Sequence, residues 1–375
     1  MIVAFASNFL NHHQLPLALA FNSMPGVAYY FLAFTPTPES RLAMGYDDMN
    51  AEFPFVVRAY ESEKERERAI SIIKTADIFI SGYTDDLIRI RLKEGKRVYK
   101  FSERYFKTYG LRDIKHSTLH FFFSALKHIW PFRRKDVVYL AASAYLKADL
   151  NRFFKCHNTV LRWGYFPEHI PFGAPSKRGN GEIKLLWVGR YLRWKHPESA
   201  IKAFAALTKA GKSCELTMAG GGECKNEMME LAKELGVYDA ISWLPPMPFK
   251  EVRQLMRESD IFLFTSDSSE GWGAVLNEAM DSRCAVIATK EAGSTPFLIR
   301  NGLNGYSYSW DDQEELNRLT ESLADNKELR EKLQERAYKT IERLWNAEVA
   351  AKRLIEFDQK GVHYEDGPCS VFEEK

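Results

Sequence analysis

The chain has 375 residues, of which 45% are hydrophobic and 27% are charged. This composition is that of a globular protein and excludes disordered, collagen-like and coiled-coil classes. The length favours two domains, because a single core rarely grows beyond about 250–300 residues. The net charge of +2 gives no indication of nucleic-acid binding. The five cysteines include no CxxC pair, which favours a cytoplasmic protein with reduced thiols.

The first half of the chain alternates short apolar runs with helical patterns. Strands are expected at 2–7, 27–34, 77–82, 97–103 and 137–143, and helices at 15–22, 61–76 and 86–94. Such alternation indicates βαβ units and a mostly parallel sheet, so the fold class is α/β.

The second half repeats this architecture after a segment rich in Pro, Gly and charge at 170–182, which we interpret as a linker. Strands are expected at 183–188, 215–219, 240–244, 261–265 and 285–288, with helices such as 198–210 and 226–235 between them. Residues 313–357 are predicted to form two helical stretches, and the tail after residue 360 is predicted to be poorly structured.

The segment LLWVGRYLRWKHP, residues 185–197, places a loop directly after a buried strand. Open α/β sheets bind ligands at the carboxyl ends of their strands, and Arg190 and Lys195 follow Gly189 in this loop. Two cations at that position suit a diphosphate. The alternative is that both are solvated charges on a surface loop. The glycine run at 220–222 is more simply a tight turn.

The segment SSEGWGAVLNEAM, residues 268–280, follows another apolar strand. A helix is expected to begin near Ala274, and its free N–H groups favour phosphate. Glu270 and Glu278 could accept hydrogen bonds from sugar hydroxyls on either side of that helix start. The alternative is that Glu270 caps the helix and Glu278 is solvated. The glycines on both sides of Trp272 disfavour this alternative.

The E-x7-E spacing with EGWG, preceded by VGR and Lys, resembles the retaining glycosyltransferases of family 4. The segment SNFLNHHQLPLALAF, residues 7–21, is similar to bacterial members of that family that build surface polysaccharides. The resemblance covers the whole chain in layout and about 181–357 in motif. It implies the GT-B fold, in which two Rossmann-like domains face each other across a cleft. The domains would be 1–172, which binds acceptor, and 173–345, which binds nucleotide sugar. A helix at about 346–360 would pack back onto the first domain, and 361–375 would be a tail.

The resemblance also implies roles for particular residues. Glu270 would face the donor sugar and Glu278 would bind the nucleotide ribose. Arg190 and Lys195, next to Gly189, would neutralise the diphosphate. The backbone of Gly271, Trp272, Gly273 and Ala274 would hold phosphate and sugar. The implied reaction moves a hexose from a UDP- or GDP-type sugar to an acceptor hydroxyl, with retention of configuration and without a metal cofactor.

Several residues depart from the family pattern. Trp272 stands where Phe is usual, Asn277 where an apolar residue is common, and His196 where Gly is usual. Asn11, His12 and His13 replace the glycine-rich loop after the first strand. These three residues, with Glu103 after a later strand, are candidates for contact with phosphate or acceptor; the alternative for the first three is a polar turn.

The stretch at 111–135 is basic and aromatic, and residues 85–135 hold 14 Lys and Arg against 5 Asp and Glu. One interpretation is a peripheral surface that contacts anionic lipid at the inner face of the membrane and reaches a lipid-linked acceptor. The other is an ordinary helix with Phe121, Phe122, Phe123, Leu126 and Ile129 in the core.

The sequence is also compatible with other functions. A nucleotide-sugar epimerase or a phosphorylase could use the same two-domain fold, and a non-catalytic subunit could keep the donor motifs without turnover. A Rossmann oxidoreductase is disfavoured, because no GxGxxG follows the first strand of either half.

Overall fold

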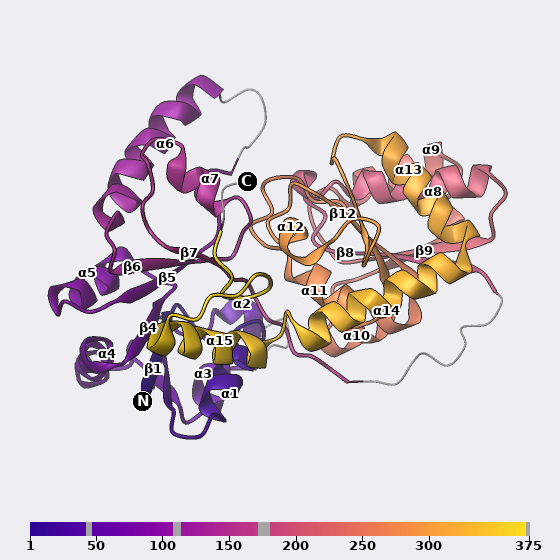
Figure 1. Ribbon diagram of the computed structural model, residues 1–375. Coiled ribbons are helices and arrows are strands. Elements are labelled where there is room, and N and C mark those ends of the chain that lie inside the picture. The colour runs from indigo at the N-terminus through magenta and orange to yellow at the C-terminus, as the bar shows by residue number, and fades with distance from the viewer. Residues whose placement is uncertain (43–46, 108–113, 172–180, 373–375) are drawn as a thin grey trace. The chain divides into compact units, whose positions relative to one another are not determined.

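The computed structural model describes residues 1–42, 47–107, 114–171 and 181–372, and its contacts divide the chain into two compact units (Figure 1). The first unit comprises Met1–Glu168 together with Trp345–Lys375, and the second comprises His169–Leu344. The boundary expected between residues 172 and 173 lies outside the described residues.

The first unit is built on a seven-stranded parallel sheet of order β3-β2-β1-β4-β5-β6-β7. Its strands are β1 (Ile2–Ser7), β2 (Ala28–Ala33), β3 (Val56–Arg58), β4 (Ile78–Ser81), β5 (Val98–Ser102), β6 (Val137–Ala141) and β7 (Val160–Arg162). The sequence predicted five of them and missed β3 and β7, which have only three residues each and carry little pattern.

Helices pack on both faces of this sheet. They are α1 (Leu15–Asn22), α2 (Glu39–Leu42), α3 (Met49–Glu52), α4 (Glu63–Thr75), α5 (Asp85–Lys93), α6 (Ile114–His128), α7 (Leu146–Asn151) and α15 (Ala347–Lys360). Apolar side chains of α4, α5, α6 and α7 join one buried cluster with the strands. Helix α15 packs against α1.

The second unit has a six-stranded parallel sheet of order β10-β9-β8-β11-β12-β13. Its strands are β8 (Ile183–Val188), β9 (Cys214–Ala219), β10 (Ile241–Leu244), β11 (Ile261–Phe264), β12 (Ala285–Thr289) and β13 (Tyr306–Tyr308). Its helices are α8 (Pro197–Lys209), α9 (Lys225–Glu234), α10 (Phe249–Glu258), α11 (Ala274–Asp281), α12 (Thr295–Leu298), α13 (Gln313–Asp325) and α14 (Lys327–Arg343).

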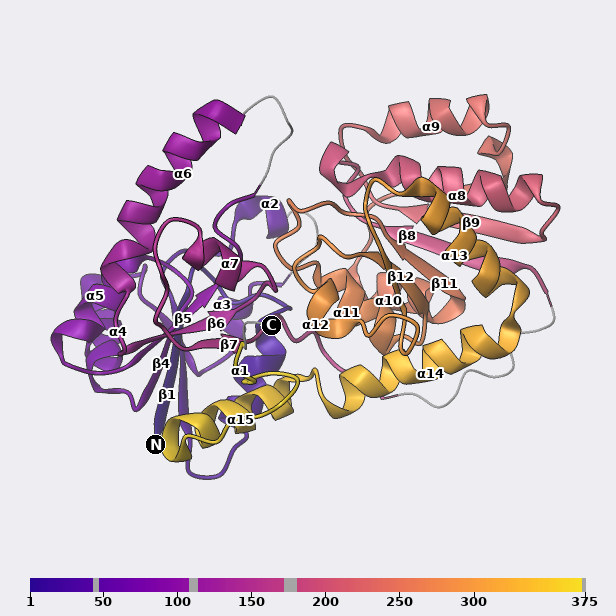
Figure 2. The same ribbon diagram turned by 45° about the horizontal axis from the view of Figure 1, so that its top comes forward.

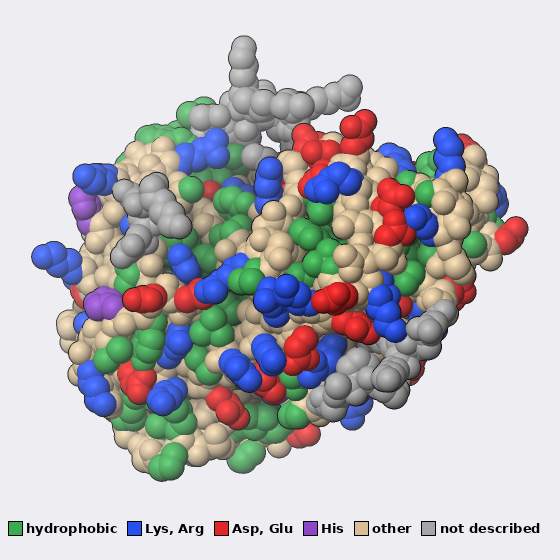
Figure 3. Space-filling view, turned by 45° about the vertical axis from the view of Figure 1, so that its right-hand side comes forward, with side chains coloured by type: hydrophobic (Ala, Val, Ile, Leu, Met, Phe, Trp, Pro, Cys, Tyr) green, Lys and Arg blue, Asp and Glu red, His purple; other side chains and the backbone are tan. Residues whose placement is uncertain are grey.

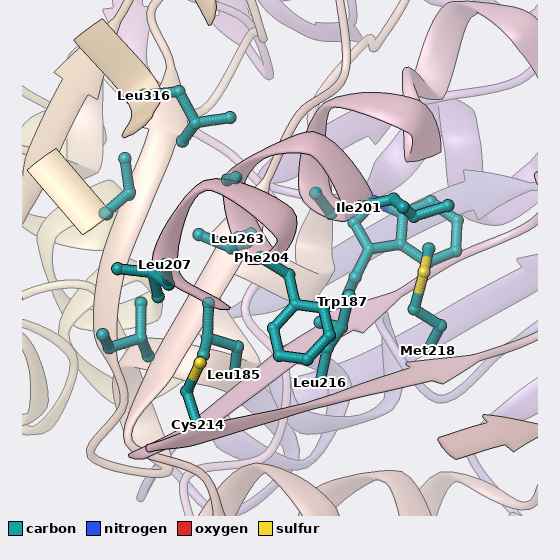
Figure 4. Close-up of a cluster of buried hydrophobic side chains, with 14 of the residues drawn as sticks. Leu185, Trp187, Ile201, Phe204, Leu207, Cys214, Leu216, Met218, Leu263 and Leu316 are labelled. Atoms are coloured by element: carbon teal, nitrogen blue, oxygen red, sulfur yellow. The ribbon is translucent and has the colours of Figure 1, made fainter. Parts of the chain in front are cut away.

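These helices form two layers around the second sheet, with α8, α9 and α13 together and α10, α11 and α14 together (Figures 1 and 2). Figure 4 shows the core beneath the first group: Leu185, Trp187, Leu216 and Met218 from the strands meet Ile201, Phe204 and Leu207 of α8. The expected fold class, two Rossmann-like parallel-sheet units, is confirmed.

The helical region 313–357 forms three helices rather than the expected two. Asn326 and Asn346 interrupt it, and each accepts a hydrogen bond through its side chain from the backbone N–H three residues later. Such N-caps satisfy the free N–H groups of a new helix and restart the chain at a different angle. Periodicity alone does not distinguish one long helix from two capped ones.

The expectation of a poorly structured tail is wrong for residues 361–372. Val371 forms an antiparallel bridge with Leu161 of β7, and Tyr364 pairs with Ser370. Arg353 of α15 donates to the Pro368 carbonyl at 3.1 Å, and Cys369 is fully buried. The tail thus covers the exposed edge of the first sheet, a common way to protect unpaired strand groups.

In both sheets the strand order reverses beside the first strand of the unit: β1 lies between β2 and β4, and β8 lies between β9 and β11. Ligands of open α/β sheets bind beyond the carboxyl ends of the strands at such points. Ligand-binding residues are therefore expected in the loops that follow β1, β4, β8 and β11.

Candidate active site

The loop after β8 packs tightly against the glycine run that follows β9. Gly220 has φ +143°, and a Cβ atom added to it would lie 1.9 Å from the Gly189 carbonyl oxygen. The next turn of the chain is fixed by the Tyr191 N–H, which donates to the Gly221 carbonyl at 2.9 Å. The glycine run at 220–222 thus serves close packing beneath the candidate loop, beyond the tight turn inferred from sequence.

The structure brings Lys195 and Glu270 together. Lys195 Nζ donates to Glu270 Oε2 at 2.6 Å, and the Ser266 hydroxyl donates to the same oxygen at 3.1 Å. The two paired side chains are only 14% and 13% exposed. A cation and a carboxylate from loops 75 residues apart therefore meet at the edge of the second sheet where β8 and β11 end.

Hydrogen bonds between the two loops hold this pair in place. The Asp267 N–H donates to the Trp194 carbonyl at 2.9 Å, and Thr265 Oγ1 donates to the Lys195 carbonyl at 2.6 Å. Thr265 in turn accepts from the buried Trp187 indole at 3.0 Å. The backbone carrying Lys195 is thus tied to the segment that carries Glu270, which preorganises the two side chains.

Helix α11 starts directly behind Glu270, as expected, with Ala274 as its first residue. Gly273 caps it with φ +88°, and a Cβ atom there would lie 2.3 Å from the Phe264 ring. Only glycine fits this conformation and this space. The first N–H groups of the helix have no acceptor within it and present a positive dipole end, the arrangement that favours phosphate.

Trp272 and Asn277, which both depart from the family pattern, form a hydrogen bond with each other. Trp272 is 1% exposed, and its indole Nε1 donates to the Asn277 side-chain oxygen at 2.9 Å, with Asn277 also 1% exposed. The larger aromatic residue requires a hydrogen-bond acceptor when buried, and the asparagine supplies it. The Trp272 side chain therefore anchors the glycine turn inside the unit, so any contact with a ligand falls to the backbone of this turn.

His196 occupies the place where the family usually has glycine, and the backbone shows why glycine is usual. Its φ is +45°, the left-handed region that is costly for residues with a side chain. The imidazole is held by Glu198 at 2.9 Å and Asp267 at 3.2 Å. Burial lowers the pKa of His196, but the two carboxylates outweigh it and raise the pKa to about 9.

Glu278 lies on α11 in a deeply buried position, 5% exposed. Burial raises its pKa to about 7, partly opposed by the nearby Arg253. Arg253 is also buried and donates to the Glu278 carbonyl at 3.0 Å and to the Asp281 carboxylate. Glu278 is thus a buried carboxylate within the site, not the solvated residue of the alternative interpretation.

Asp281 joins this network to the segment that enters the second unit. His169 Nδ1 lies 2.5 Å from its carboxylate, and the Ile170 N–H donates to it at 3.2 Å. The hydrogen bond to Asp281 raises the pKa of His169. Sequence reasoning missed Arg253, Asp281 and His169, since nothing local distinguishes them from solvated charges on helices.

Unlike Lys195, Arg190 is not part of an ion pair among the described residues. It is exposed at the end of β8. Gly189 lies beside it, half-buried against Trp187 and Lys195. The structure thus joins Lys195 with Glu270 but does not join Arg190 to either.

Two of the candidates in the first unit, Glu103 and His13, lie beside Tyr165. Its hydroxyl donates to Glu103 at 3.1 Å, and its ring lies 6.1 Å from that of His13. His12 and His13 have ring centroids 3.8 Å apart. Asn11 closes the turn before α1, accepting from the His13 N–H at 3.0 Å, so for Asn11 the polar-turn interpretation describes what the structure shows.

The comparisons with known proteins agree with the fold and with the kind of domain expected for the second unit. Residues 173–340 match the family model of the glycosyl transferases group 1. This match lies almost wholly within the second unit, and it agrees with the resemblance to glycosyltransferases seen in the E-x7-E segment.

Individual relatives share smaller stretches. The chain is 30% identical over 191 residues to glycosyltransferase MJ1069 of Methanocaldococcus jannaschii, covering 50% of this chain and 48% of that protein. It is 29% identical over 201 residues to D-inositol 3-phosphate glycosyltransferase of Corynebacterium kroppenstedtii, covering 46% of this chain and 44% of that protein. The chain thus spans less than half the length of these two curated relatives.

Solved structures match over nearly the whole length. Alr3699/HepE of Anabaena in complex with UDP has a TM-score of 0.66 at 14% identity and covers 96% of this chain and 100% of that one. The lipopolysaccharide outer core galactosyltransferase WaaB has a TM-score of 0.65 at 18% identity and covers 96% and 100%. At these identities the likeness shows the fold, which is that of the GT-B glycosyltransferases.

Proposed function

We propose that the protein is a retaining glycosyltransferase that moves a hexose from a UDP- or GDP-type sugar to an acceptor hydroxyl. The observation that carries this proposal is the Lys195–Glu270 pair beside the start of α11. Such a site offers a cation and helix N–H groups to a diphosphate and a carboxylate to sugar hydroxyls. The group 1 domain match and the UDP complex of the HepE neighbour support this choice.

The proposed chemistry is mainly electrostatic. Negative charge grows on the leaving diphosphate as the glycosidic bond breaks, and Lys195, Arg190 and the N-terminus of α11 would stabilise it. The leaving phosphate can take the proton of the acceptor hydroxyl, so no dedicated base is required. With these positive groups available, the proposed reaction needs no divalent metal. Glu270 would hold the donor sugar and Glu278 the ribose.

A binding experiment with three proteins tests this proposal. The wild type, Glu270→Gln and Glu278→Ala would be titrated with UDP- and GDP-sugars, with magnesium and with EDTA, and turnover measured in parallel. We expect Glu278→Ala to weaken nucleotide binding at least tenfold, through lost hydrogen bonds to a charged group. Glu270→Gln should instead lower turnover at least a hundredfold with nucleotide affinity nearly unchanged. A wild type that binds no nucleotide sugar, or needs magnesium to do so, would contradict the proposal.

We further propose that α6 brings the enzyme to an anionic membrane, which would suit polysaccharide or glycolipid synthesis. No helix in the described part of the chain has the length and apolarity to cross a membrane. Yet Leu119, Phe123, Leu126 and Trp130 are 62%, 59%, 37% and 51% exposed. Leu119, Phe123 and Leu126 are spaced four and three residues apart, which places them on one side of α6. Trp130 lies just beyond the end of α6, in the short helical turn Trp130–Phe132.

The buried side of the same helix differs from this stripe. Ala125 and Ile129 are buried in the core, whereas Phe123 and Leu126, which the core interpretation would bury, are exposed. Residues 111–113 of the stretch lie outside the described residues. Lys127 is exposed beside the stripe, and the Arg133 guanidinium lies 4.7 Å from the Trp130 ring centroid. Arg134 pairs with Asp136. An exposed apolar stripe with flanking cations is typical of interfacial helices.

Vesicle binding tests this proposal. Leu119→Ser/Phe123→Ser should reduce sedimentation with phosphatidylglycerol vesicles several-fold, because two apolar side chains no longer insert. The matched control is Leu235→Ser/Leu303→Ser, which changes two similarly exposed leucines of the second unit, 41% and 42% exposed. Equal binding by the wild type and the α6 variant would leave the stripe as an ordinary exposed surface.

A further inference from the structure

A pocket of about 480 Å³ opens within the first unit at the carboxyl ends of β4 and β5. Its lining includes Tyr83, Asp85, Arg89, Lys100, Lys127 and His128. These residues come from the loop after β4, the first turns of α5, strand β5 and the end of α6, which lies beside α5 in both views (Figures 1 and 2). The volume is that of a small-molecule site.

Three charged or ionisable groups form the centre of this pocket. Lys100 Nζ donates to Asp85 Oδ1 at 2.7 Å and to the His128 carbonyl at 3.1 Å, and its side chain is 8% exposed. His128 Nδ1 lies 2.6 Å from the other Asp85 oxygen. Asp85 therefore has both oxygens engaged, and the exposed part of the His128 ring, 40% of that side chain, remains available to a ligand.

The rim of the pocket adds positive charge. Arg89 and Lys127 are both exposed, and neither forms an ion pair with a residue that the structure describes. Two cations lie over the Phe132 ring, with Lys100 Nζ at 4.2 Å and the Arg89 guanidinium carbon at 5.3 Å from its centroid. The pocket is thus lined by three cations, Arg89, Lys100 and Lys127, and by two carboxylates, Asp85 and Asp86. This balance is positive even when His128 is neutral. The pocket favours an anionic ligand.

Other groups suit a polyhydroxylated ligand. Ser81 lines the pocket, is 2% exposed, and its hydroxyl has no hydrogen-bond partner among the described residues. Tyr83 is 42% exposed and stacks on Phe34 with centroids 5.5 Å apart and planes at 16°. A fixed aromatic ring with one free face can pack against the apolar face of a sugar, and a buried hydroxyl without a partner gains from a new one.

We propose that this pocket binds a sugar that carries a phosphate, and that this sugar is the acceptor. Arg89, Lys127 and the His128 ring would hold the phosphate, while Ser81 and Tyr83 would contact the sugar. Asp85 and Lys100 are positioning residues, because they act through His128. The acceptor role rests on the proposed transfer reaction, whereas the binding itself does not.

Calorimetric titration of the full chain tests the proposal. UDP is kept at saturation so that sugar phosphates cannot occupy a donor site, and the probes are glucose 6-phosphate, glucose and inorganic phosphate. Glucose 6-phosphate should bind more tightly than either fragment. Arg89→Ser/Lys127→Ser, which changes exposed residues only, should weaken it about tenfold or more, by loss of charged contacts. The control Arg66→Ser/Lys93→Ser removes one exposed Arg and one exposed Lys outside the pocket and should have no effect.

The outcomes separate this proposal from the proposed function. UDP affinity should be the same in the wild type and in both double variants, because neither pair of residues belongs to the donor site. A wild type that fails to bind UDP would contradict the proposed donor site but not the pocket. Glucose binding as tightly as glucose 6-phosphate, or equal losses in the pocket variant and its control, would overturn the pocket assignment.

A second arm identifies the source of the ligand. Vesicles with phosphatidylinositol are compared with vesicles of phosphatidylglycerol, which has the same charge but no ring. A loss in Arg89→Ser/Lys127→Ser that is clearly larger on phosphatidylinositol than on phosphatidylglycerol would support a lipid headgroup as the ligand, because removing Lys127 as a membrane-contacting charge affects both vesicles equally. Equal vesicle binding together with weakened glucose 6-phosphate binding would support a soluble sugar phosphate.

Discussion

At the residue scale, the three positions of the second unit that depart from the family pattern, His196, Trp272 and Asn277, each have a neighbour that compensates for the change. His196 tolerates a left-handed backbone because Glu198 and Asp267 hold its ring on two sides and Trp310 stacks on it at 4.7 Å. Trp272 is accompanied by Asn277. A substitution that is unfavourable alone becomes acceptable when the partner changes with it, which single positions in a sequence do not reveal.

His196 gives a prediction with a defined pH window. Its pKa is raised from 6.5 to about 9 in the folded state, so its stabilisation is complete below about pH 6.5 and lost as the pH rises through 9. Relative to His196→Gly, the wild type should be more stable by about 2 kcal/mol at pH 6. At pH 10 the glycine variant should match or exceed it, because glycine avoids the strained backbone. Urea unfolding at both pH values measures this, and a difference that does not change with pH would contradict the ion-pair explanation.

At the element scale, α11 depends on the turn before it. The Gly273 cap and the buried Trp272 fix where the helix begins, and Arg253 binds the Glu278 carbonyl near its other end. An eight-residue helix is too short to be stable by itself, so tertiary contacts at both ends hold it. The same contacts place Glu270 and Glu278.

A double-mutant cycle tests the coupling within this element. Trp272→Phe removes the indole donor to Asn277 and leaves a smaller side chain, and should cost about 2–4 kcal/mol of unfolding free energy. Asn277→Leu removes the acceptor. The double variant should cost at least about 1 kcal/mol less than the sum of the single losses. Unfolding of all four proteins by denaturant provides the measurement, and strictly additive losses would show that the two residues act independently.

At the scale of the whole molecule, the two units are built differently along the chain. The second unit is continuous from His169 to Leu344, whereas the first is completed by α15 and the tail from the far end of the sequence. Ala350, Ala351, Leu354 and Phe357 of α15 are buried. On the face drawn in Figure 3, acidic and basic side chains intermix between apolar ones, consistent with the small net charge of +2.

This arrangement predicts that a truncation at one end destabilises the other. Ending the chain at Leu344 removes α15, and burial of Leu354 and Phe357 alone contributes about 3–6 kcal/mol. That is a large part of the stability of an ordinary domain. We expect protease to digest residues 1–168 of the truncated protein rapidly while 169–344 remains protected. Equal protection of both parts would show that α15 contributes little to the first unit.

Much of the fold was predictable because its signals are local. Apolar runs of four to six residues predict strands. A glycine next to a carboxylate, just before a helical apolar pattern, predicts a loop that can bind a ligand. For this reason the strands β1, β4, β8 and β11 and the segments carrying Lys195, Glu270 and Glu278 were found without a structure. The short strands β3, β7 and β13 lack enough residues for any pattern.

The sequence by itself determined two parallel-sheet units, the order of their elements and the loops that carry the candidate donor residues. Only the tertiary structure decided which charges meet. Lys195 joins Glu270 across 75 residues, His169 joins Asp281 across 112, and Asp85 joins His128 across 43. A charged side chain has the same local signature whether it faces water or a partner, so such pairs become visible only when the sheet brings distant loops to one edge.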